Sequence, residues 1–185
     1  MMLTMYKKSL LSIAFAMAVS VTVFAQTSQT ANLNITLSSV LSMTISGAEI
    51  TVDFDDATKY SDGITSTVAN HLTVTSNRPY TVSAIAGVVS GGSSLSPNDV
   101  KLTTVIGTGN AGNTTGLSYT SGTAIPTAAS GASIDVVTAT NSSWNGNAPS
   151  NTFDVTYLIG ANGAFTNKTL ASDNIIPVIY TVVAN

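Results

Sequence analysis

The chain has 185 residues, of which 8% are charged and none is cysteine, and its formal net charge at pH 7 is −3. The absence of cysteine excludes disulfides, cysteine-based metal sites and a cysteine nucleophile. Beyond Lys8 the basic residues are scattered, so the sequence offers no basic patch for nucleic acid.

The N-terminal segment has the order of a secretory signal peptide. Lys7 and Lys8 precede an apolar run that ends at Ala25, and a polar stretch follows. The run is too short to span a bilayer comfortably, although an uncleaved membrane anchor is the alternative. We therefore expect removal of residues 1–25 and export of one domain, residues 26–185, to the periplasm, the outer-membrane surface or the medium. Loss of the two lysines changes the net charge from −3 to −5, and we expect no transmembrane segment in the mature chain.

The segment after the predicted cleavage site alternates apolar and polar residues. Leu33, Ile35 and Leu37 share one face in a period-two pattern, which resumes over residues 41–45 after a slip. We expect the domain's own first strand here, with a bulge at the slip. The alternative is that Leu33, Ile35 and Leu37 belong to a self-association strand that pairs with a neighbouring copy.

Acidic residues follow a short expected strand at residues 50–54. Asp55, Asp56 and Asp62 lie close together in the sequence, with Gly63 after them. Oxygen-rich loops of this kind can hold Ca²⁺, so the three carboxylates are candidate calcium ligands, although their spacing matches no EF-hand. The alternative is a solvated acidic loop, and the sequence implies no other cofactor.

Turn residues separate the next expected strands. Residues 71–76 and 80–84 flank an Asn-Arg-Pro turn at residues 77–79, which predicts a β-hairpin. A further strand is expected at residues 100–106.

The second half of the chain begins with a glycine-rich stretch at residues 107–131. We expect an irregular surface excursion there, with Tyr119 and Ile125 as its internal anchors. Strands are expected at residues 134–137 and 153–159, and the latter alternates as a half-buried strand does.

The C-terminal segment, residues 175–184, is apolar on both faces, which predicts a central strand. Together these segments make about eight short strands with turns between them and few helix-forming residues. The sequence therefore predicts an all-β fold, a single β-sandwich with an immunoglobulin-like topology. A β-helix is the alternative, but no fixed-period repeat supports it.

Catalytic patterns are missing from the sequence. His71 is the one histidine, which excludes the HExxH type of zinc site and gives no basis for a Ser-His-Asp triad. The carboxylates fall in expected turns or on polar strand faces instead of facing each other across a cleft. We expect no enzymatic activity.

Trp144 lies in a polar loop that contains Asn141, Asn145 and Asn147. An aromatic ring can stack on a sugar face while neighbouring amides bond the sugar hydroxyls, so these residues are a candidate carbohydrate-binding site. The alternative is that Trp144 folds back over the end of the sandwich and caps the core.

Residues 72–83 and 178–185 resemble the "V-x-S-N-x-x-aromatic-x-V" hairpin and the closing "Y-T-V-x-A" strand of small secreted bacterial surface proteins. Those proteins are similar to fimbrial subunits, spore-coat-U-like proteins and WxL-type domains, and the sequence resembles those of Bacteroidetes surface proteins. The resemblance implies a structural or adhesive role at the cell surface, such as that of a fibre subunit, with like subunits, other surface proteins or glycans as partners. The chain departs from the pilin pattern in lacking a cysteine pair, and from WxL domains in having Tyr80 where Trp is expected.

Overall fold

The computed structural model describes residues 31–92, 94–169 and 174–185, so the predicted signal peptide lies outside the described residues. The chain divides into a first unit that ends at Leu37 and a second unit, Ser38–Asn185. In the described part of the first unit the backbone forms no strand, and the side chains of Leu33, Ile35 and Leu37 are 82%, 70% and 89% exposed.

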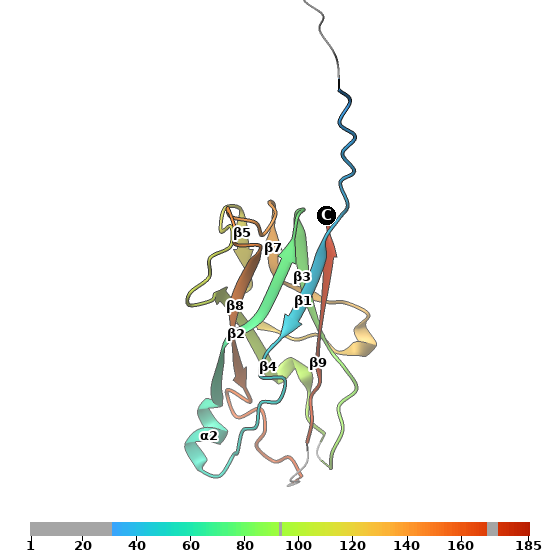
Figure 1. Cartoon of the computed structure of the whole chain (residues 1–185). Helices are drawn as coiled ribbons and strands as arrows, with labels where there is room; N and C mark the ends of the chain where they lie inside the picture. Colours follow the sequence, from blue (N-terminus) through green and yellow to red (C-terminus); the bar gives the residue numbers. More distant parts are fainter. Residues whose placement is uncertain (1–30, 93, 170–173) are drawn as a thin grey trace, which may run out of the picture. The chain divides into compact units, whose positions relative to one another are not determined.

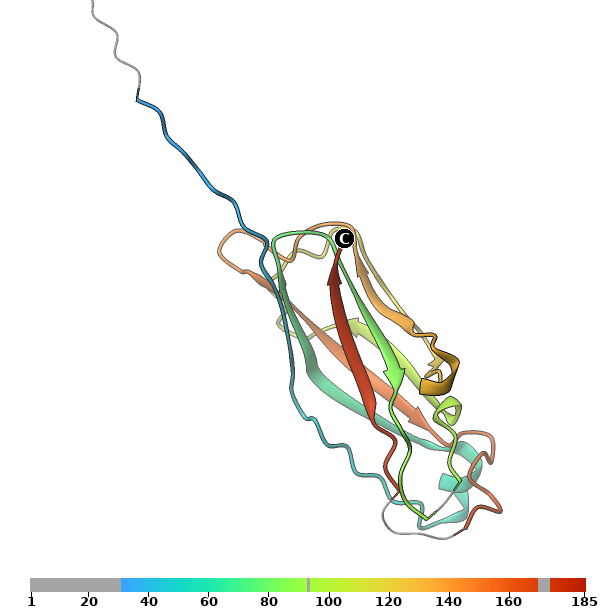
Figure 2. The same ribbon diagram turned by 90° about the vertical axis from the view of Figure 1, so that its right-hand side faces the viewer.

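The second unit is a sandwich of two antiparallel sheets (Figures 1 and 2). Its strands are β1 (Leu41–Ile45), β2 (Ile64–Ser76), β3 (Tyr80–Ala86), β4 (Val100–Ile106), β5 (Leu117–Tyr119), β6 (Thr123–Ala124), β7 (Ile134–Ala139), β8 (Ser150–Ile159) and β9 (Val178–Ala184). One sheet has the order β1-β2-β8-β4-β6 and the other β5-β7-β3-β9. The predicted all-β sandwich is confirmed.

In the part of the chain that the structure describes, helical structure is limited to short elements: α2 (Ala57–Asp62) and the 3-10 turns η1 (Pro97–Asp99) and η2 (Ala128–Ser130). Among the described residues, no helix is long and apolar enough to cross a membrane.

Alternating side chains from the two sheets build the core. On β3, every second residue from Tyr80 to Ala86 is buried, and on β8 Phe153, Val155 and Tyr157 are buried while their neighbours are half-exposed. Period-two burial places one face of each strand against the opposite sheet, as in other sandwiches. Ile125 is fully buried, which confirms it as an internal anchor of the glycine-rich stretch, whereas Tyr119 is 38% exposed.

The predicted hairpin around residues 77–79 is wrong. The turn carries the chain from β2 in one sheet to β3 in the other, and the two strands do not pair. Both strands bury an apolar face, that of Leu72 and Val74 on β2 and that of Tyr80 and Val82 on β3. The turn residues specify a reversal of direction, whereas the need to bury both faces decides that the strands face each other across the core.

The predicted central position of the C-terminal strand is also wrong. β9 pairs with β3 alone among the described strands and lies at the edge of its sheet. Its outward-facing Ile179 and Val183 are half-exposed. An apolar strand at an edge is unusual, because edges are normally protected by charged residues or proline.

The long first strand that the sequence predicts is shortened to β1, and the strand expected at residues 50–54 does not pair. β1 pairs with β2, and the chain then leaves the sheet at Gly47, whose φ of 59° lies in the left-handed region that favours glycine. Opposite this point, the register of β2 shifts between Val68 and Leu72. Because the chain turns away at Gly47 and β2 bulges beside it, the sheet that contains β1 has, among the described residues, no edge strand beyond this point.

Candidate functional site

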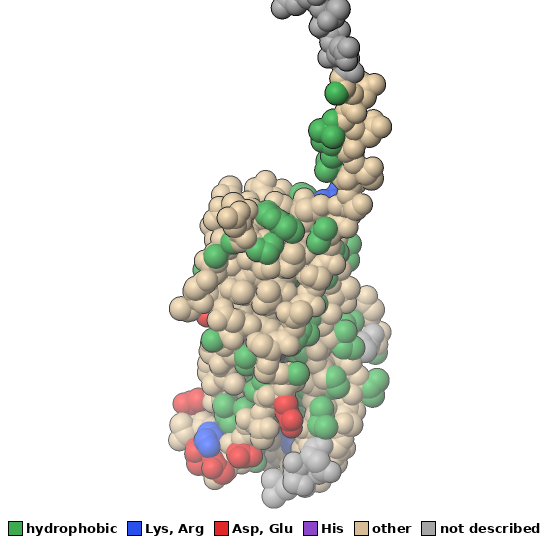
Figure 3. All heavy atoms as spheres, in the orientation of Figure 1, with side chains coloured by type: hydrophobic (Ala, Val, Ile, Leu, Met, Phe, Trp, Pro, Cys, Tyr) green, Lys and Arg blue, Asp and Glu red, His purple; other side chains and the backbone are tan. Residues whose placement is uncertain are grey.

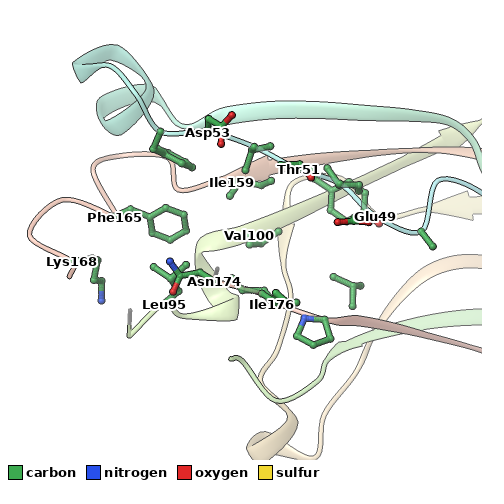
Figure 4. Close-up of a pocket in the computed structure, with 18 of the residues that line it drawn as sticks. Glu49, Thr51, Asp53, Leu95, Val100, Ile159, Phe165, Lys168, Asn174 and Ile176 are labelled. Atoms are coloured by element: carbon green, nitrogen blue, oxygen red, sulfur yellow. The ribbon is translucent and has the colours of Figure 1, made fainter. Parts of the chain in front are cut away.

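A cavity of about 1340 Å³ opens on one side of the second unit (Figure 4). One wall is the segment at residues 48–55, which follows β1, and the other is the segment at residues 174–178, which leads into β9. In Figure 4, Asp53 lies along the first wall, Ile176 lies on the second, and Val100 lies between them. The cavity is therefore a gap between the edges of the two sheets.

Apolar and polar side chains alternate along the first wall. Ile50, Val52 and Phe54 are half-buried, while the residues between them are exposed. The ring of Phe54 packs against those of Tyr60 and Phe165, with centroids 5.4 Å and 5.2 Å away. The segment thus keeps a strand-like alternation without a place in either sheet, and both its half-buried apolar residues and the exposed residues between them line the cavity.

A chain of hydrogen bonds crosses the polar part of the cavity lining. Nδ1 of His71 bonds the backbone carbonyl oxygen of Ser46, Nε2 of His71 lies 2.9 Å from Oη of Tyr157, and that oxygen lies 2.7 Å from Oη of Tyr180. A carbonyl oxygen only accepts, so Nδ1 of the neutral imidazole carries the proton and Nε2 accepts from Tyr157. Tyr157 then accepts from Tyr180, which leaves the remaining lone pair of the Tyr180 hydroxyl as an acceptor at the cavity.

The bulge in β2 explains why His71 reaches this position. It places His71 and Leu72, which are neighbours in sequence, both in the interior, and His71 is only 3% exposed. Burial lowers the pKa of His71 below its ordinary value of 6.5, and the hydrogen bond to Ser46 opposes this effect only in part. Burial also raises the pKa of the Tyr157 and Tyr180 hydroxyls, so the network is uncharged at neutral pH.

This network predicts a loss of stability in mild acid. Because the pKa of His71 is lowered by folding, the unfolded chain binds a proton more readily as the pH falls below about 6.5, and the free energy of unfolding decreases there. Urea unfolding at about pH 7.5 and about pH 5.5 measures the difference. The His71→Gln variant is the control and should lose this pH dependence; an equal slope in both proteins would contradict the assignment.

The structure gives the three candidate calcium ligands other partners. Asp55 forms an ion pair with Lys59, which lowers the pKa of the Asp55 carboxyl; Oδ1 of Asp56 accepts from the backbone N–H of Lys59 at 2.9 Å and caps α2. Asp62 accepts from the Ser61 hydroxyl at 2.6 Å. In the described parts of the chain, no group of three or more acidic, histidine or cysteine side chains is close enough to hold a metal ion. Acidic side chains do gather on the surface around α2 (Figure 3).

The Trp144 loop lies at the end of the sandwich that holds the turn between β2 and β3. Its anchor is Ser143, which is fully buried and whose Oγ accepts from the backbone N–H of Ser76 at 2.7 Å. Trp144 itself is 40% exposed, and Asn147 is exposed in the turn that follows. The indole is therefore partly exposed to solvent and partly buried.

Two of the side-chain amides around Trp144 form hydrogen bonds within the protein. Nδ2 of Asn141 donates to the carbonyl of Thr115 and Nδ2 of Asn145 donates to that of Ala111, each at 3.1 Å. These bonds fix the loop and leave the side-chain oxygens of the two asparagines, which can only accept, for a sugar hydroxyl.

The remaining predicted site consists of Leu33, Ile35 and Leu37, which lie in the first unit. The cavity and its tyrosines were not found by sequence reasoning. A signal did exist in the alternation of residues 50–54, which resembles a strand, but only the tertiary structure shows that no sheet receives it.

No family model matches the chain, and no curated protein is measurably similar to it. The family resemblance drawn from residues 72–83 and 178–185 stays a prediction.

Proposed function

We propose that this chain is an exported structural or adhesive protein of the cell surface that assembles with copies of itself as a fibre subunit. The observation that carries the proposal is the exposure of Leu33, Ile35 and Leu37, each at least 70% exposed and spaced two residues apart in a segment that forms no strand. Exposed apolar side chains that follow the period of a strand are a binding element for another sheet. The order of residues 1–25, typical of a signal peptide, supports export.

The proposal is tested by measuring self-association. Sedimentation and electron microscopy of the purified protein should show oligomers or fibres at micromolar concentration. The combined substitution Leu33→Ser, Ile35→Ser and Leu37→Ser should weaken association at least ~1000-fold, because each buried aliphatic side chain contributes about 1.5 kcal/mol or more.

Polar residues of the same segment provide the matched control. Asn34→Ser and Thr36→Ser alter the opposite face of the alternation and should leave association unchanged. A wild-type protein that stays monomeric at high concentration contradicts the proposed function.

A second candidate function is carbohydrate binding at Trp144, favoured by the 40% exposure of its ring on a loop anchored by the buried Ser143. On a glycan array, Trp144→Ala should abolish binding by the protein and change its melting temperature little, whereas Trp144→Phe should keep part of the binding because it retains an aromatic face. Unchanged glycan binding together with a large loss of stability would instead assign Trp144 a role in capping the core.

A further inference from the structure

The cavity between the edges of the two sheets has the form of a small-molecule binding site. It has a volume of about 1340 Å³. Half-buried Ile50 and Val52 border it on one side, half-buried Ile176 and Val178 border it on the other, and the buried Val100 lies between the two walls. Small ligands occupy concave sites with mostly apolar walls and a few placed polar groups. The polar groups of the cavity therefore decide which ligand it accepts.

The hydrogen-bond chain at one end of the cavity presents an acceptor to a ligand. Its direction is set by the carbonyl oxygen of Ser46, which only accepts, so His71 donates from Nδ1, Tyr157 donates to His71 and Tyr180 donates to Tyr157. The hydroxyl proton of Tyr180 is used in this chain, and its oxygen is left to accept. Since Tyr180 lines the cavity, a ligand that bonds this oxygen has to bring a donor.

The charged side chains around the cavity favour a cation. Glu49 and Asp53 contribute exposed carboxylates to the first wall, and Lys168 is the one lysine or arginine among the described residues of the lining. The Lys168 ammonium already donates to the carbonyl oxygen of Ser94 at 2.9 Å, whereas the Glu49 carboxylate bonds none of the residues that the structure describes. Figure 4 shows Glu49 and Lys168 at opposite ends of the cavity. The end at Glu49 is therefore negative and attracts positive charge.

Glu49 and the hydrogen-bond chain belong to the same end of the cavity. Glu49 follows Ser46 by three residues, and three residues of extended chain span at most about 11 Å. A cationic donor at this end meets a carboxylate and the Tyr180 acceptor. The rest of such a molecule extends between the apolar walls toward Phe165, which lies beside Lys168 at the other end (Figure 4).

We propose that the cavity binds an amphipathic organic cation, with its ammonium group at Glu49 and Tyr180 and its apolar body between the two walls. An ammonium group has three donors and no acceptor, which matches the polar groups at this end. The apolar body gains free energy in proportion to the apolar area that it removes from water. The inference goes beyond the proposed function, because it requires no association between copies.

Three probes with the same octyl body and different head groups test the ligand class: octylammonium, octanol and octanoate. An NMR titration at about pH 7.5 keeps the amine charged, since alkyl ammonium groups such as that of lysine have a pKa near 10.4. Octylammonium should bind with saturation, octanol about 5-fold more weakly and octanoate at least ~10-fold more weakly. Octanoate binding as tight as that of octylammonium would exclude a cation site, and the absence of saturable octylammonium binding would exclude the site altogether.

The same titration locates the probe. His71 is the one histidine of the chain and lines the cavity, whereas Trp144 is the one tryptophan and does not. Octylammonium should shift the imidazole proton signals of His71 and leave the indole signal of Trp144 in place. A saturable shift at Trp144 with none at His71 would place the probe outside the cavity.

Glu49→Gln removes the negative charge without removing a contact within the described chain. It should weaken octylammonium binding about 5-fold, the effect of an exposed ion pair, and leave octanol binding unchanged. Asp62→Asn is the matched control, because it changes the net charge equally at a carboxylate outside the lining. Equal octylammonium affinity in Glu49→Gln and the wild type would contradict the position of the ammonium group.

Ile176→Trp fills the space between the walls and should weaken octylammonium binding at least ~10-fold. Val52→Trp does the same from the opposite wall, and thermal unfolding checks that each variant is folded. A folded variant of this pair that binds octylammonium like the wild type would show that the cavity is not the site. The combined substitution of Leu33, Ile35 and Leu37 by serine should leave binding unchanged, so the outcome is independent of the proposed self-association.

Discussion

Phe153→Ala should lower the free energy of unfolding by about 3–5 kcal/mol, the range found when a large buried side chain is replaced by alanine. Phe153 is fully buried on β8, which lies between β2 and β4 in its sheet. Its ring also packs edge-on against that of Tyr119, with centroids 6.1 Å apart. Removal of the ring loses the favourable free energy of its transfer from water to the core. It also leaves a void that the flanking strands cannot close without breaking their pairing.

Urea denaturation of the purified protein measures this effect. Val105→Ala is the matched control, since Val105 is 46% exposed on the neighbouring strand β4, and its substitution should change the free energy of unfolding by no more than about 0.5 kcal/mol. A loss below about 1 kcal/mol for Phe153→Ala would contradict the central position of this side chain.

Tyr157→Phe should lower the free energy of unfolding by about 1–3 kcal/mol, although it removes a single oxygen atom. The hydroxyl of Tyr157 both donates to Nε2 of His71 and accepts from Tyr180. Its removal leaves the Nε2 acceptor of His71, a residue that is only 3% exposed, and the hydroxyl donor of Tyr180 without that partner. The cost comes from desolvation of these two groups, since the volume of the side chain barely changes.

A control and a double-mutant cycle separate this effect from a general loss of packing. Tyr119→Phe should be nearly neutral, because Tyr119 is 38% exposed and its hydroxyl bonds none of the residues that the structure describes. The double variant of Tyr157→Phe and Tyr180→Phe should lose less unfolding free energy than the two single variants lose in sum. The reason is that removal of both hydroxyls leaves fewer unsatisfied groups. Strict additivity would argue against a connected network.

Sequence patterns alone determined the fold class. The strict alternation of Phe153, Val155 and Tyr157 predicts a half-buried strand, and that strand forms because side-chain direction along an extended backbone alternates whatever the partner is. The buried role of Ile125 was also predicted, because an aliphatic residue within a polar, glycine-rich stretch is the one available to anchor it. The alternation of residues 33–37 was read as the domain's own first strand, whereas the described backbone forms no strand there. The candidate residues of the Trp144 loop were likewise visible, because an aromatic residue among amides needs no tertiary information to be noticed.

Tertiary structure alone decided the pairing of strands and the cavity. The Asn-Arg-Pro turn is compatible with a hairpin and with a crossing between sheets, and the apolar faces of Leu72 and Tyr80 selected the crossing. Period two says which side chains share a face, but not whether a neighbouring strand exists, so residues 50–54 and β9 were placed wrongly. His71, Tyr157 and Tyr180 meet only because a bulge turns one of them inward and the two sheets bring the others within 3 Å, distances that depend on the packing of segments far apart in the sequence.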